Sequence, residues 1–78
     1  MSNTKTFTVA AASSNRINVY DAMTGSIHRV ITLGGQTIVG APVVFGDGFT
    51  VSVSEGGQTY MLTYGFPLCN IKSKSHVS

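Results

Sequence analysis

The stretch from residue 40 to residue 64 most constrains the fold, because two glycine turns divide it into three short apolar runs. The first turn is Gly46-Asp47-Gly48 and the second is Glu55-Gly56-Gly57. Glycine turns between short runs of Val, Phe, Tyr and Thr are typical of antiparallel strands joined as hairpins. The stretch therefore predicts three consecutive antiparallel strands.

The same pattern extends over the rest of the chain. Phe7 and Val9 fall on one face of an expected first strand, and Ile17 and Val19 fall on one face of a second. No window has a sustained apolar period of 3.6 residues, so we predict no helix of consequence. Strands are expected at residues 5–12, 16–22, 26–33, 41–45, 49–54, 58–64 and 68–72, with a polar tail at residues 74–78.

The length and composition predict one small domain, residues 1–78, that depends on neighbours. Cys69 is the single cysteine, so no disulfide can form within the chain, and His28 and His76 lack partners at metal-ligand spacing. Charged residues are 10% of the chain, against about 25% in an average domain. A surface so poor in charge stays soluble when much of it is covered, so we expect a homo-oligomer and no bound metal.

Several classes of function are disfavoured by charge and hydropathy. The net charge of +2 is small and scattered, so we expect no nucleic-acid binding. No apolar run approaches the ~18 residues of a membrane helix, and the first residues lack the apolar core of a secretory signal. These features and the lone cysteine favour a cytoplasmic location. Because the sequence begins with Met1, we expect a complete reading frame.

An internal repeat is the second architectural signal. Phe7-Thr8-Val9 recurs as Phe49-Thr50-Val51, an offset of 42 that also sets residues 17–20 against residues 59–62. The order of strands and turns then matches in two approximate units, residues 5–35 and residues 36–73. A period of ~40–50 residues with four strands per unit is that of propeller blades.

Two segments carry a family resemblance. Residues 19–27 (VYDAMTGSI) resemble the strand–turn–strand of propeller repeats written D-x-x-T-G, and residues 40–57 resemble a PQQ-type or YVTN-type blade. The resemblance implies antiparallel four-stranded blades, three strands in the first unit and four in the second. Two blades cannot close a ring, so the resemblance predicts closure by association, with three copies favoured. A small β-sandwich or barrel is the alternative fold.

The sequence favours a function without catalysis. No nucleophile–base pair or paired carboxylate is visible, and Asp21 and Asp47 are interpreted as turn residues. No residue matches a quinone site, so no cofactor is expected. The first hypothesis is a non-enzymatic structural or interaction module, an oligomeric propeller platform that would suit a virion or phage component or an adaptor.

Two other functions are kept as alternatives. A lectin-like propeller would bind glycans between blades through Arg16, Tyr60 and Tyr64, because aromatic faces and hydrogen-bonding side chains suit sugars. In the competing interpretation these tyrosines only pack between blades. An enzyme subunit of PQQ type is the least favoured hypothesis, and a bound chromophore would reveal it.

Overall fold

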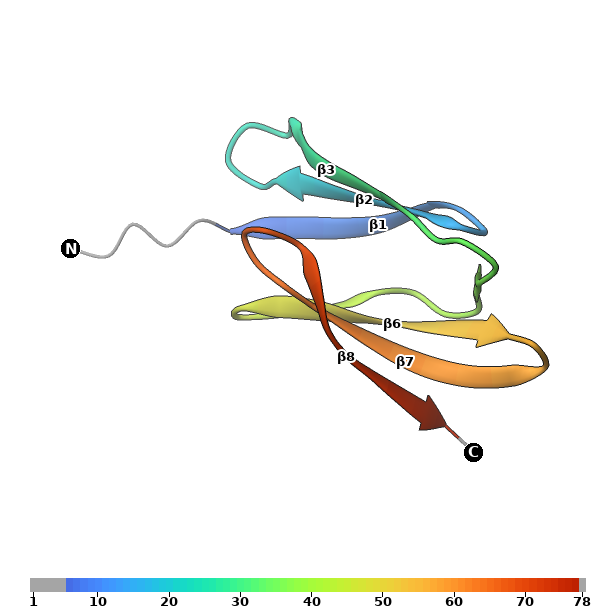
Figure 1. Ribbon diagram of the computed structural model, residues 1–78. Coiled ribbons are helices and arrows are strands. Elements are labelled where there is room, and N and C mark those ends of the chain that lie inside the picture. The colour runs from blue at the N-terminus through green and yellow to red at the C-terminus, as the bar shows by residue number, and fades with distance from the viewer. Residues whose placement is uncertain (1–5, 78) are drawn as a thin grey trace.

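The computed structural model describes residues 6–77, and within them the chain is all-β, with antiparallel strands and no helix (Figure 1). This confirms the predicted all-β, helix-free character of the described part. Since residues 6–77 contain no helix, none is available there to cross a membrane. The strands are β1 (Phe7–Ser13), β2 (Arg16–Asp21), β3 (Ile27–Thr32), β4 (Thr37–Ile38), β5 (Val43–Phe45), β6 (Gly48–Glu55), β7 (Gln58–Gly65) and β8 (Asn70–Val77).

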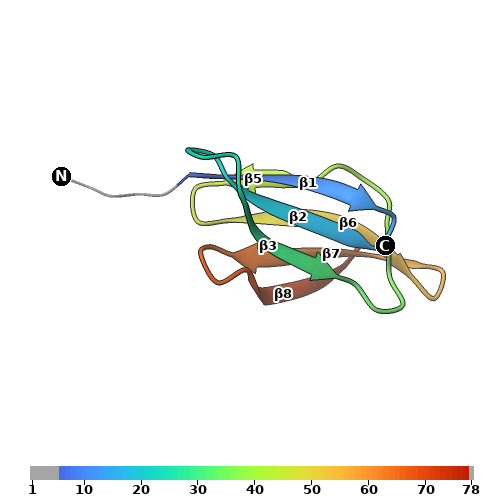
Figure 2. The same cartoon turned by 90° about the horizontal axis from the view of Figure 1, so that it is seen from above.

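The strands form two separate sheets. One has three strands in the order β1-β2-β3, and the other has five strands, in which β6 pairs with β4 and β5 on one edge and β7 leads to β8 on the other. The sheets lie as two layers, one above the other (Figures 1 and 2). Neither sheet closes on itself, so the arrangement is compatible with the small β-sandwich that the sequence left as an alternative, and not with a closed barrel.

The core lies between the two layers and follows from the period of two along each strand. On β6, Phe49, Val51 and Val53 are buried, while the residues between them face outward. On β2, Ile17 and Val19 alternate in the same way. Burial of each such side chain stabilises the fold by about 1.5–3 kcal/mol. The buried cluster is completed by Phe7, Leu33, Leu62, Tyr64 and Cys69.

The largest differences from the sequence prediction concern β8, β4 and β5. The expected polar tail is wrong, because β8 runs to Val77 and pairs with β7 as far as Thr59. All eight residues of this edge strand are exposed, so its sequence has no apolar alternation to reveal it. Strand β4, only two residues long, lies between the strands expected at residues 26–33 and 41–45, where no strand was predicted. The strand expected at residues 41–45 corresponds to β5, which begins at Val43, after Pro42.

The offset of 42 does not hold for the second strand of each unit. It sets Val19 against Met61, but Val19 is buried and Met61 is 39% exposed. Val9 and Val51, which are 42 residues apart, pair with Val19 and Leu62 on the next strand. Those two partners are 43 residues apart. A bulge in β1 between Ala11 and Ser13 shifts the pairing by one residue.

Gly48 provides a test of how closely β6 and β7 approach. A Cβ at Gly48 would overlap the backbone oxygen of Tyr64, whereas a Cβ at Gly46 would meet nothing within 4 Å. We expect Gly48→Ala to lower the free energy of unfolding by about 2 kcal/mol or more, and Gly46→Ala to change it by no more than about 0.5 kcal/mol. Urea denaturation of both variants measures this, and equal midpoints would contradict the close approach.

Candidate functional site

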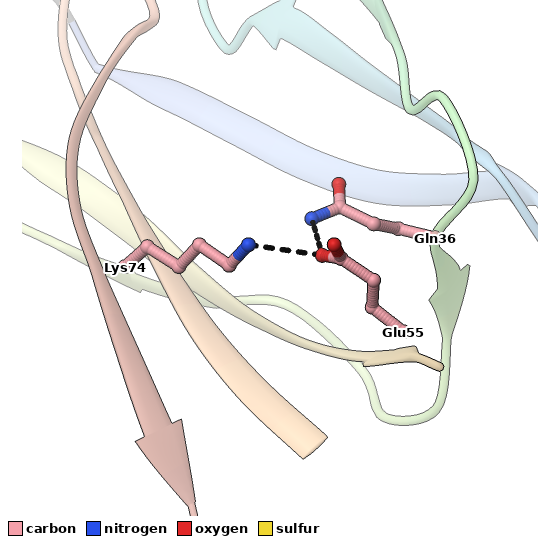
Figure 3. Close-up of polar contacts among 3 residues, drawn as sticks. All are labelled: Gln36, Glu55 and Lys74. Atoms are coloured by element: carbon pink, nitrogen blue, oxygen red, sulfur yellow. Dashed lines mark hydrogen bonds and ion pairs between the residues drawn. The ribbon is translucent and has the colours of Figure 1, made fainter. Parts of the chain in front are cut away.

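Among the described residues, a group of polar side chains centres on Glu55 (Figure 3). Glu55 Oε1 accepts a hydrogen bond of 2.8 Å from Gln36 Nε2 and one of 3.0 Å from Lys74 Nζ. These side chains come from the segment before β4, the end of β6 and the middle of β8, so the carboxylate joins three segments. The Gln36 hydrogen bond, followed by the hydrogen bond and charge of Lys74, lowers the pKa of Glu55.

The turn after Glu55 explains why the carboxylate lies at this point. Gly56 has φ of 59° and Gly57 has φ of 80°. Two consecutive residues with positive φ form the tight hairpin turn that matches strand twist, and glycine adopts it without strain. Glu55 pairs with Gln58 across this turn, so Glu55 closes β6 beside the start of β7.

Aromatic side chains extend the group along β7 and β8. Lys74 Nζ lies 4.5 Å from the centroid of the Tyr60 ring, and the rings of Tyr60 and His76 are 5.1 Å apart. Tyr60 and His76 are cross-strand partners, and His76 Nε2 shares a hydrogen bond with Gln58 Oε1. We call the following set the Tyr60 cluster: Gln36, Glu55, Gln58, Tyr60, Lys74 and His76.

The Tyr60 cluster has the chemistry of a binding surface. It offers amide, carboxylate, amine and imidazole groups around an aromatic ring, all at one end of the five-stranded sheet. The carboxylate already accepts bonds from Gln36 and Lys74, which oppose its use as a base. Among residues 6–77 no three His, Cys, Asp or Glu side chains gather to hold a metal ion.

The three residues predicted for ligand binding have different environments. Tyr60 lies in the Tyr60 cluster and is half-buried, whereas Tyr64, on the same face of β7, is only 6% exposed. Tyr64 stacks on Phe49 with ring centroids 5.0 Å apart, and burial raises the pKa of its hydroxyl. Arg16 is exposed at the start of β2, in the other sheet, where it pairs with Ser13 and Thr32.

Sequence reasoning missed the other members of the Tyr60 cluster. Glu55 and Gln36 are separated by 19 residues, and so are Glu55 and Lys74, so only the folded chain brings them together. The sequence of β8 contains one pattern that could have predicted the strand. Lys72, Lys74 and His76 alternate with serines, which is the period of a strand.

A second polar group joins the two sheets. A bulge in β3 interrupts its pairing with β2 at His28, next to Arg29. His28 Nε2 donates to the backbone oxygen of Pro67 at 2.6 Å, and Arg29 Nε donates to that of Leu68 at 3.1 Å. A bulge directs neighbouring side chains to the same side of a strand, so both residues reach the β7–β8 turn.

The same turn buries the cysteine thiol. Cys69 is 5% exposed. Burial raises the pKa of Cys69, an effect that the charge of Arg29 opposes. The thiol is therefore a packed apolar side chain at neutral pH and not an activated nucleophile.

Comparisons with known proteins give no assignment. No protein-family model matches the chain, and searches of curated proteins and of solved structures give no significant match.

The Glu55 contacts predict a pH dependence of stability. Because the pKa of Glu55 is lower in the folded chain than its ordinary value, the ionised carboxylate stabilises the fold. This contribution is complete at neutral pH and is lost as the pH falls and Glu55 becomes protonated. We expect the melting temperature of Glu55→Gln to fall below that of the unmodified protein at about pH 7, and the gap to close towards about pH 3.

A pair of lysine variants provides the control for this pH dependence. Lys74→Met should reduce the acid sensitivity as Glu55→Gln does. Lys72→Met should preserve it, because the Lys72 side chain packs over Gly65. A gap between Glu55→Gln and the unmodified protein that stays constant from neutral to acid pH would contradict the role of the ion pair.

Proposed function

We propose that this chain is a non-enzymatic structural or interaction module that works as a homo-oligomer. In this proposal its two sheets act as blades of an oligomeric β-propeller platform, and three copies complete the ring. The observation that carries the proposal is the outward face of the five-stranded sheet, which is large, open and almost without charge.

The residues of this face are set by strand register. Thr50 pairs with Thr63, and Ser52 pairs with Met61, and each of these alternates with core residues along its strand. Met61 is 39% exposed in the centre of the face. One charged side chain, Lys72, reaches the face at a corner, over Gly65. We call the following set the outer five-strand face: Val43, Phe45, Thr50, Ser52, Ser54, Thr59, Met61, Thr63, Ser73, Ser75 and Val77.

Such a face is unusual for a surface that stays in water. Val43 and Val77 are 62% and 43% exposed on it, and Phe45 is 41% exposed. Covering apolar area stabilises an assembly by about 25 cal/mol per Å². Ser and Thr hydroxyls cost less to cover than charges do. The outer five-strand face therefore suits packing against another sheet.

Mass in solution tests the proposal. We expect light scattering after gel filtration to give three times the mass of the 8.2-kDa chain. Thr63→Lys places a charge in the middle of the outer five-strand face and should shift the mass towards that of one chain, because burying an unpaired charge is costly. Ser14→Lys, in the exposed β1–β2 turn, should leave the mass unchanged. A single-chain mass for the unmodified protein would overturn the proposal.

Glycan binding is the second candidate function, and the Tyr60 cluster favours it. A glycan array probed with the unmodified protein should then give a signal that Tyr60→Ala abolishes and Lys74→Ala weakens. Lys72→Ala, on the same strand but outside the cluster, is the matched control. Arg16→Ala tests whether the three-stranded sheet also takes part. An array without signal would remove this candidate and leave the structural module.

A further inference from the structure

We infer that neighbouring copies join head to tail, with the outer five-strand face of one copy packed on the outward face of the β1-β2-β3 sheet of the next. The inference rests on the proposed homo-oligomer and identifies its interface. Two different surfaces of the chain would meet, so the partner of each surface is a second copy.

The outward face of the three-stranded sheet is also uncharged over most of its area. Ala10 pairs with Asn18, and Asn18 pairs with Val30, to give its central row. Val30 is 49% exposed and Ile27 is 55% exposed. A charged residue, Arg16, lies on this face at the β1–β2 turn. We call the following set the outer three-strand face: Thr8, Ala10, Asn18, Tyr20, Ile27 and Val30.

The residue sizes on the two faces would let them interdigitate. Met61 is the long side chain in the centre of one face, beside small serines. On the other face Ala10 and Asn18 lie in one row that ends at Val30. The larger Tyr20 lies in the next row, opposite Ile27. Alternating large and small residues across facing positions lets layers interdigitate.

Hydrogen-bonding groups also favour contact between unlike faces. Asn18 Nδ2 donates to the Tyr20 hydroxyl at 3.1 Å, but Asn18 Oδ1 is buried without a hydrogen-bond partner in the single chain. The outer five-strand face is rich in Ser and Thr hydroxyl groups, which can donate hydrogen bonds to an amide oxygen. Two outer three-strand faces packed together would instead bring two such acceptors to the same interface.

Symmetry gives the last argument. A two-fold contact of one face with itself ends at two copies and leaves the other face of each copy open to water. A head-to-tail contact covers both faces of every copy, and it closes a ring when the rotation between copies allows. Arg16 and Lys72 are both positively charged and lie at the corners of the two faces. Because like charges repel, we expect the two copies to align so that these residues are far apart.

Cysteine crosslinking distinguishes these arrangements. A chain carrying both Ala10→Cys and Met61→Cys, treated with a short bismaleimide, should give linked dimers and trimers on a denaturing gel. Each single variant should give no more linkage than the unmodified protein, whose Cys69 is buried. A chain with Ser14→Cys and Met61→Cys, which places one thiol in the exposed turn, controls for random collision.

The outcomes separate this inference from the proposed function. Crosslinking of Met61→Cys alone, or of Ala10→Cys alone, would show a two-fold contact and overturn the inference. An oligomeric mass with no linkage in the double variant would also overturn it, and the homo-oligomer would stand. A single-chain mass for the unmodified protein would overturn both. Light scattering on each variant comes first, and Thr8→Cys with Thr63→Cys replaces any pair that disturbs the assembly.

Discussion

A row of aromatic rings between the two layers holds the rest of the structure in place. Phe7 of β1 contacts Phe66 of the β7–β8 turn, with ring centroids 4.6 Å apart, and Phe66 contacts Phe49 of β6 at 5.8 Å. Phe49 in turn stacks on Tyr64 of β7 at 5.0 Å. The row begins in one sheet and ends in the other, so the relative position of the sheets depends on it. The backbone contacts of His28 and Arg29 fix the same turn from the β3 side, because both side chains bind its carbonyl oxygens.

The sequence predicted the hairpins because their determinants are local. The turn at Gly56-Gly57 needs positive φ at two positions, and the alternation of Phe49, Val51 and Val53 marks the inward face of β6 without reference to any partner. The second half of β8, after residue 72, escaped prediction because an exposed edge strand has no inward apolar residues to alternate. Its lysines are themselves a property of edges, where charge prevents pairing with other chains.

The candidate site was less predictable than the fold, for a physical reason. Tyr60 was recognisable from the sequence as an aromatic residue on a strand. Gln36 and Lys74 join the Tyr60 cluster only through contacts between segments that are distant in the sequence. Tyr64 shows the opposite failure of sequence reasoning. It has the same residue type and strand face as Tyr60, and its burial depends on the layer above β7, which no local pattern describes.

The distribution of charge connects the fold to assembly. Edge strands β3 and β8 carry Arg29, Lys72 and Lys74, and Arg29 and Lys74 are engaged with backbone or carboxylate groups of the chain. The broad outward faces of both sheets carry mostly hydroxyls and apolar side chains, with Lys72 and Arg16 at their corners. An isolated sandwich would gain solubility from the reverse arrangement, with charge on its faces. In the proposed assembly the faces are covered and the edges stay free of further pairing, and this distribution of charge would suit both. The proposed packing of copies against one another would account for the low charge of the sequence.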